Sequence, residues 1–123
     1  MKKDIPEIRD TLQRLLKQQV PPLKIRTDSE ENFEVAGTKE TMQGKQKVDG
    51  FYFASVVPKP KDVRFYFFPI YTHPDQFQLS DDLKKLLKGK SCFHVKHLTP
   101  ELEKELRLHI EKGVDLYQGD HLI

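Results

Sequence analysis

Apolar and aromatic side chains are concentrated in the middle of the chain, between residues 50 and 95. Two runs stand out, FYFASVV at 51–57 and VRFYFFPIYT at 63–72, and a segment rich in proline and lysine separates them. Aromatic and β-branched runs bounded by such turn residues are typical of strands, so the two runs predict a β-hairpin. Because most of the phenylalanines lie in this stretch, their rings should supply much of the area that folding removes from water.

Both sides of these two strands carry apolar or aromatic residues. In the first strand, Phe51 and Phe53 alternate with Tyr52 and Ala54, and the second strand follows a similar pattern. A strand that is apolar on both sides is normally covered on both sides. We therefore expect helices to cover most of both faces of the sheet, with a second subunit as the alternative cover.

One helix is predicted before this hairpin in the sequence and one after it. The first begins at the N-cap Asp4 and ends before Pro21, because two consecutive prolines cannot donate hydrogen bonds and disfavour helical conformation in the residue before them. The second follows the N-cap Ser80 and should end at Gly89, a natural residue for the end of a helix. Both carry an apolar stripe at helical spacing, so both should pack against the sheet.

The last third of the chain predicts one short strand and one long helix. Residues 91–95 (SCFHV) alternate as a strand does, and Thr99–Pro100 opens the helix with an N-cap and a proline in the first turn. Gly113 lies near the centre of the apolar face of this helix. The missing side chain there should let another element approach closely.

The stretch from residue 23 to residue 50 gives a weaker pattern. Alternation predicts a strand near 32–37, and a second strand fits either 38–42 or 45–48, with Gly44 as the turn. The stretch is polar and rich in lysine, which is typical of edge strands and equally of a mobile loop. The sequence leaves both interpretations open.

These elements together predict a single α+β domain over residues 1–123. The order is roughly α-β-β-β-β-α-β-α, with an antiparallel sheet of four to five strands flanked by three helices. Helices that pack on an antiparallel sheet form one of the few stable layered arrangements, and the chain is long enough to bury a core of its own.

Composition narrows the class of protein. Lys and Arg total 21 against 19 Asp and Glu, so the net charge is +2, which does not favour nucleic acid as a partner. Cys92 is the single cysteine, which fits a reducing compartment. No apolar run approaches the ~20 residues of a membrane span, and no apolar region follows Met-Lys-Lys as in a signal peptide. We therefore expect a cytoplasmic protein without a membrane partner.

Four segments carry a family resemblance: FYFASVV (51–57), FYFFPIYTHP (65–74), LKKLLKGKSCFHVK (83–96) and EKGVDLY (111–117). Over about residues 45–118 the chain resembles the YdhG-like family of small bacterial domains of unknown function. The resemblance implies an α+β fold of the secretion-chaperone-like type, with helices around a curved antiparallel sheet. It implies no established reaction. Some members carry a frataxin-like iron-chaperone label, which makes metal handling an alternative function.

A metal site is the sharpest chemical hypothesis. On a strand, Cys92 and His94 project to the same face, and His73 could supply a third ligand. Thiolate and imidazole are ligands that zinc accepts. His97 has the opposite parity and no second cysteine is present, so Cys92 is also explained as a small core residue. Our main expectation is no cofactor, with iron or zinc on His73, Cys92 and His94 as the alternative.

Two charge clusters give further alternatives. Acidic residues gather at 28–34, where an oxygen-rich iron site would need them, although the pI of about 8.6 does not favour such a site. Lysines gather at 84–96 and at 59–61, where a polyanion could bind. The dipole of a helix favours lysines at its C-terminal end, and surface lysines also favour solubility. These two effects explain the lysine cluster as well as polyanion binding does.

No catalytic residue is predicted, because the sequence contains no phosphate-binding glycine loop and no recognisable pair of acid and base. We expect a binding or chaperone-type module without catalysis, with weak polyanion binding as a second alternative. The partner is an unknown small molecule or protein, and a free sheet edge would allow a homodimer. Strand parity favours a ligand groove between the sheet and its helices, lined by Tyr52, Tyr66, Tyr71, His73 and His94.

Overall fold

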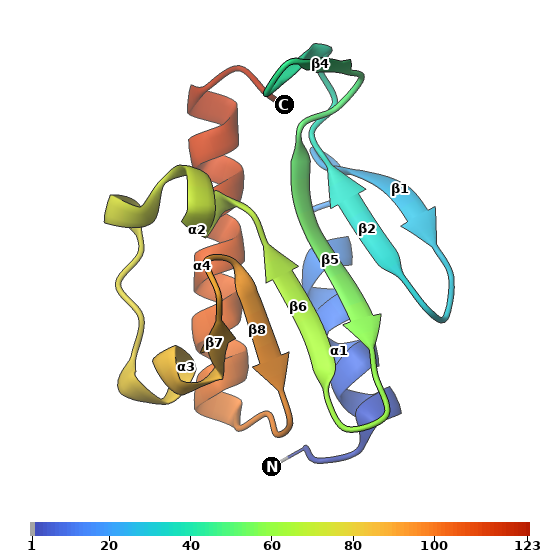
Figure 1. Cartoon of the computed structure of the whole chain (residues 1–123), viewed down its shortest axis with the longest axis vertical. Helices are drawn as coiled ribbons and strands as arrows, with labels where there is room; N and C mark the ends of the chain where they lie inside the picture. The colour runs from blue at the N-terminus through green and yellow to red at the C-terminus, as the bar shows by residue number, and fades with distance from the viewer. Residues whose placement is uncertain (1) are drawn as a thin grey trace.

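The computed structural model describes residues 2–123 as an antiparallel sheet with helices packed against it. The two long helices, α1 (Ile5–Lys17) and α4 (Pro100–Gly119), lie behind the sheet in Figure 1, and the front face of the sheet is left open. This arrangement confirms the predicted α+β class. Three shorter helical segments flank one edge of the sheet: α2 (Pro69–Thr72), η1 (Pro74–Gln76) and α3 (Asp81–Leu86).

The main sheet has six strands in the order β1-β2-β5-β6-β8-β7, and every neighbouring pair is antiparallel. Its strands are β1 (Lys24–Asp28), β2 (Phe33–Ala36), β5 (Tyr52–Pro58), β6 (Val63–Phe67), β7 (Leu87–Lys88) and β8 (Cys92–Val95). A separate two-stranded hairpin consists of β3 (Thr41–Gln43) and β4 (Gln46–Val48). The predicted count of four to five strands was therefore too low.

The region before residue 50 accounts for most of this difference. The alternatives 38–42 and 45–48 are the two strands of one hairpin, β3 and β4, rather than competing positions for a single strand. Gly44 lies in the turn with a φ of 63°, a left-handed conformation that glycine adopts without steric cost. Strand β1 was not predicted, because its sequence KIRTD alternates too weakly to be recognised.

The predicted second hairpin strand was too long. We expected it to continue to Thr72, but β6 ends at Phe67 and α2 begins at Pro69. Proline has no N–H to donate to a strand neighbour, and its fixed φ suits the first turn of a helix. The aromatic run therefore divides into a strand and a helical turn.

The predicted end of the second helix was also wrong. Helix α3 ends at Leu86, and β7 begins at the next residue. Gly89, with a φ of 77°, forms the turn between β7 and β8 instead of closing the helix. The predicted N-caps are confirmed, since Ser80 accepts a hydrogen bond from the Leu83 N–H and Thr99 accepts one from the Leu102 N–H.

The expectation that helices cover both faces of the sheet was wrong, and a β-bulge in β5 explains why. Val35 of β2 pairs with Ala54 but Ala36 pairs with Tyr52, so Phe53 is an extra residue in β5. Phe53 and Ala54 are both fully buried, and the bulge turns Tyr52 toward the open face. The adjacent residues Phe53 and Ala54 thus both belong to one core.

Other elements approach α4 closely at Gly113, as predicted. A Cβ built on Gly113 would lie 3.0 Å from Pro69 Cγ and 3.1 Å from the Cζ atoms of Phe53 and Phe67. One turn further along, the fully buried Tyr117 donates a hydrogen bond from its hydroxyl to the Tyr52 carbonyl. Burial raises the pKa of Tyr117, so this hydroxyl stays protonated and keeps the bond in alkaline solution.

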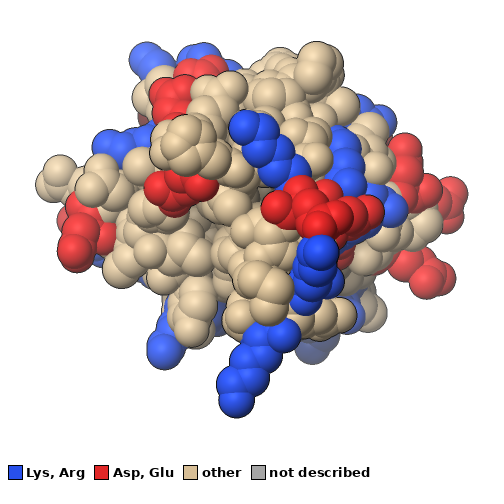
Figure 2. All heavy atoms as spheres, turned by 90° about the horizontal axis from the view of Figure 1, so that it is seen from above, with Lys and Arg blue, Asp and Glu red and all other residues tan. Residues whose placement is uncertain are grey.

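The end view in Figure 2, from the side of the β3–β4 hairpin, shows Lys and Arg interspersed with Asp and Glu. Charges of both signs alternate on this face, which agrees with the small net charge of the chain. Within residues 2–123, no helix has both the length and the apolar character that crossing a membrane would require.

Candidate functional site

The open face of the sheet carries a row of polar side chains. Cross-strand pairing places Glu34 beside Ser55, Ser55 beside Tyr66, and Tyr66 beside Cys92. Residues that are directly opposite on neighbouring strands point to the same face, so this row runs across four strands of the sheet. An antiparallel sheet that packs on helices with one face commonly presents such a polar face to water.

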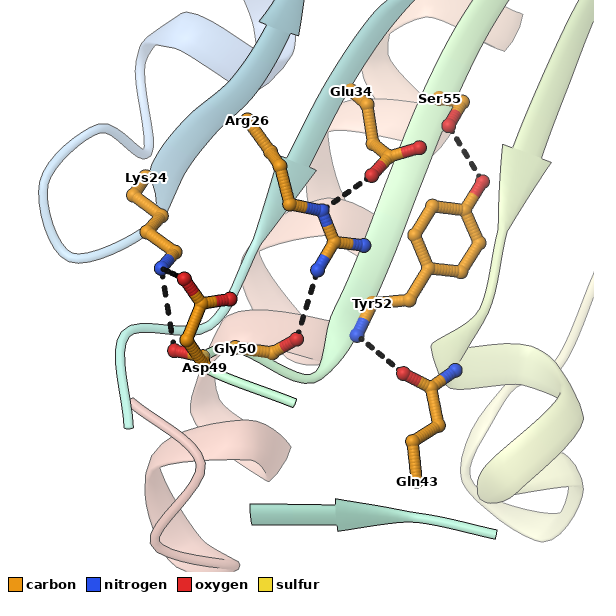
Figure 3. Close-up of polar contacts among 8 residues, drawn as sticks. All are labelled: Lys24, Arg26, Glu34, Gln43, Asp49, Gly50, Tyr52 and Ser55. Carbon is orange, nitrogen blue, oxygen red and sulfur yellow. Dashed lines mark hydrogen bonds and ion pairs between the residues drawn. The ribbon is translucent and has the colours of Figure 1, made fainter. Parts of the chain in front are cut away.

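Polar groups on this face mostly bind one another (Figure 3). The Tyr52 hydroxyl donates to Ser55 Oγ at 2.7 Å, and Arg26 donates to the Glu34 carboxylate and to the Gly50 carbonyl. Burial raises the pKa of Tyr52 to about 12, although the bond to Ser55 opposes the shift. Tyr52 is therefore neutral at physiological pH and its hydroxyl acts as a structural donor.

A row of rings leads from the open face to the edge of the sheet. The rings of Tyr52 and Phe68 have centroids 5.5 Å apart, and those of Phe68 and Tyr71 are 5.3 Å apart. Tyr71 is 48% exposed, and the Lys90 ammonium lies 5.6 Å from the centroid of its ring. This row connects the open face to a pocket at the other side of Tyr71.

We call this hollow the side pocket; it lies where α2, η1, α3 and the β7–β8 turn meet, and its volume is about 670 Å³. Its apolar walls are the side chains of Ile70, Tyr71, Pro74, Phe77, Leu79 and Leu87. Its other lining residues are Gln78, Lys84, Gly89 and Lys90. It is larger than two further hollows in the structure, of about 480 and 310 Å³.

The inner wall of the side pocket rests on the core. The ring of Phe77 packs edge-on against Phe67, with centroids 5.4 Å apart, and against the His109 imidazole at 5.6 Å. The Nε2 atom of His109 lies 3.2 Å from the Glu105 carboxylate. The wall is thus held in place by contacts with β6 and α4.

Glu105 of α4 binds Ser80 at the start of α3, and so it fixes the wall of the side pocket that α3 forms. Its carboxylate accepts hydrogen bonds from the backbone N–H of Ser80 at 2.9 Å and from the Ser80 hydroxyl at 2.6 Å. Burial by itself would raise the pKa of Glu105, but the bonds from Ser80 and His109 outweigh it and lower the pKa below its usual value. The ionised carboxylate is therefore the form that holds α3 in place.

Glu105→Gln is expected to destabilise the fold by about 1–2 kcal/mol at neutral pH, through the loss of charge-assisted bonds. The pKa of Glu105 is lower in the folded state than in the unfolded state. Its contribution to the free energy of unfolding is therefore complete above the unfolded pKa of about 4.3, and it is lost as the pH falls through the folded pKa. Urea unfolding at several pH values checks this. The exposed Glu101 supplies the control, and Glu101→Gln should change stability by a few tenths of a kcal/mol. A cost for Glu105→Gln that is independent of pH would contradict the account.

The structure distributes the five residues of the predicted groove over three places. Tyr52, Tyr66 and His94 belong to the open face, and Tyr71 lies between that face and the side pocket. His73 lies beside the end of α4, with Nε2 2.8 Å from the Asp120 carboxylate. None of the three hollows of about 670, 480 and 310 Å³ is lined by more than one of these five residues.

The proposed metal ligands are likewise divided. Cys92 and His94 share the open face, whereas His73 is engaged by Asp120 and by the Thr72 hydroxyl at 2.8 Å from Nδ1. Burial raises the pKa of the Cys92 thiol, although a hydrogen bond with Tyr66 acts against it. In the described part of the chain no three His, Cys, Asp or Glu side chains gather as metal ligands. Metal handling therefore stays a prediction.

A smaller hollow of about 480 Å³ beside the β5–β6 hairpin collects positive charge from Lys59, Lys61, Arg64 and Lys96. Asp62 lies within this cluster, and its side chain is 7% exposed. Its carboxylate accepts a hydrogen bond from Arg64 Nε at 3.2 Å. Part of the positive charge is thus already neutralised, and polyanion binding stays a prediction.

Sequence reasoning identified Tyr71 but missed the rest of the side pocket. Phe77, Leu79 and Leu87 have the appearance of ordinary core residues in the sequence, because only the fold shows that they are partly exposed around one hollow. The one usable signal was the run from Pro74 to Ser80, a connection with apolar residues at alternate positions and no predicted element.

Comparison with known proteins finds no relative of this chain. No family model matches the chain, and neither a curated protein nor a solved structure does. The resemblance to the YdhG-like family accordingly remains a prediction from the sequence.

Proposed function

We propose that the chain is a binding module without a catalytic step, and that it binds a small molecule whose apolar body occupies the side pocket. The observation that supports this most directly is the pocket itself, about 670 Å³ in volume with apolar walls. Sites for small molecules are typically hollows of about 300–1,000 Å³ lined by apolar and aromatic side chains with a few polar groups.

The walls of the side pocket favour binding because they are already in place. Phe77 is held against Phe67 and His109, and Ser80 is held by Glu105. A ligand that enters a preformed hollow does not lose affinity to the ordering of side chains, which otherwise costs about 0.5–1.5 kcal/mol for each one immobilised. The pocket can therefore bind an apolar group with measurable affinity, even though each contact with the walls is weak.

The open face is a weaker candidate, because its polar groups already satisfy one another. Tyr52 is bonded to Ser55, and Arg26 is bonded to Glu34 and to the Gly50 carbonyl. A ligand on this face would have to replace those contacts and would gain only the difference between old and new bonds. The side pocket offers apolar area without this competition.

Fluorescence titration with the neutral probe N-phenyl-1-naphthylamine tests the proposal. We expect saturable binding with a Kd of about 10–100 µM, which is the range for a ligand of this size. Tyr71→Ser, which removes one wall, should weaken binding about fivefold. Tyr71 is 48% exposed, so this change should leave the fold intact.

Leu108→Ser is the matched control, because Leu108 is 49% exposed on α4 and does not line the side pocket. It should leave the Kd of the probe unchanged. The proposal would be wrong if the probe did not saturate, or if both substitutions weakened its binding to the same degree.

A further inference from the structure

The rim of the side pocket carries two positive charges and no negative one. Lys84 and Lys90 are its charged lining residues, and the rest of the lining is apolar or neutral. Among residues 2–123, neither ammonium lies within ion-pair distance of a carboxylate. The two charges are thus available to a ligand in the pocket.

The two lysines reach the pocket from different elements. Lys84 belongs to α3, whereas Lys90 follows Gly89 in the turn between β7 and β8. The Lys90 ammonium lies 5.6 Å from the ring centroid of Tyr71, which itself forms part of the wall. This contact places the charge of Lys90 at the edge of the apolar hollow.

The helix dipole explains the position of only one of these two lysines. Lys84 lies in the last turn of α3, where the helix dipole favours a positive charge. Lys90 is outside any helix, so the dipole does not account for its position beside Tyr71. A charge next to an apolar wall is less screened than one surrounded by water, so an anionic group placed there is attracted more strongly.

From this arrangement we infer that the ligand is an organic anion, with its apolar body in the side pocket and its carboxylate, sulfonate or phosphate group between Lys84 and Lys90. The inference rests on the proposed function and adds the chemical class of the ligand. It predicts that the pocket prefers an anion over a neutral molecule of the same shape.

Two fluorescent probes with a common skeleton test this preference. N-phenyl-1-naphthylamine is neutral, and 8-anilinonaphthalene-1-sulfonate adds one sulfonate to the same rings. We expect the sulfonate to bind about tenfold more tightly than the neutral probe at 50 mM salt, with the difference shrinking at 500 mM. The double variant K84Q/K90Q should lose most of this tenfold preference and bind the neutral probe unchanged.

The double variant K104Q/K112Q is the matched control. It removes two exposed lysines of α4, so its net charge equals that of K84Q/K90Q. It should keep the preference for the sulfonate. If the neutral probe binds but the sulfonate is not preferred, or if both double variants lose the preference equally, the inference fails and the proposed function stands. If neither probe saturates, both are overturned.

Discussion

Phe53→Ala is expected to lower the free energy of unfolding by about 4 kcal/mol, the largest effect of any single change considered. Phe53 is fully buried, and its ring packs edge-on against Phe67 and Tyr117 with centroids 5.7 and 5.1 Å apart. Truncation leaves a cavity where the bulge of β5 meets α4, and rings held on both sides cannot collapse into it. Urea unfolding followed by circular dichroism measures the loss.

The neighbouring phenylalanine serves as the comparison for this effect. Phe51 is only partly buried, although it also contacts Tyr117. Phe51→Ala should therefore cost about half as much as Phe53→Ala. Equal costs at the two positions would mean that the bulge does not direct Phe53 into the core.

Gly113→Val is expected to destabilise the fold by about 3 kcal/mol. Its Cβ would meet a proline ring and two phenylalanine rings at 3.0 to 3.1 Å, closer than ordinary contact distances. These rings belong to α2 and the two central strands, so α4 would have to move away from the sheet. Gly113→Ala should show a smaller loss, because alanine favours a helix by about 1 kcal/mol over glycine.

Gly119 provides the control on the same helix, since a Cβ there has open space around it. Gly119→Ala should be neutral or slightly stabilising in the same unfolding experiment. Stabilisation by Gly113→Ala of the same size as that by Gly119→Ala would contradict the close packing of α4.

Local signals in the sequence predicted much of the fold. The caps at Asp4, Ser80 and Thr99 depend on hydrogen bonds within one turn, so a short stretch of sequence contains the whole cause. The glycine at position 113 was predicted from helical periodicity alone, which is equally local. Features of this kind require no knowledge of the neighbouring elements.

The features that were missed depend on tertiary packing. The bulge at Phe53 appears only when β5 pairs with β2, and strand β1 owes its conformation to pairing with β2. The sequence of Phe53 and its neighbours is that of an ordinary strand. For this reason strand parity predicted a second covered apolar face that the fold does not have.

The candidate site was harder to predict than the fold for the same reason. Lys84 and Lys90 lie on separate elements, and the turn at Gly89 brings both to one hollow. Of the five residues expected in a groove, only Tyr71 lines the side pocket. Residue type and strand parity identify which side chains could bind, but they do not show which of them share a cavity.

Mapping of backbone amide shifts shows whether the side pocket, rather than the open face, holds the apolar body of a small molecule. During titration of the isotope-labelled chain with N-phenyl-1-naphthylamine, we expect the largest shift changes within residues 70–90, around the pocket lining. Changes centred on Tyr52, Tyr66 and His94 would instead place the ligand on the open face and contradict the account.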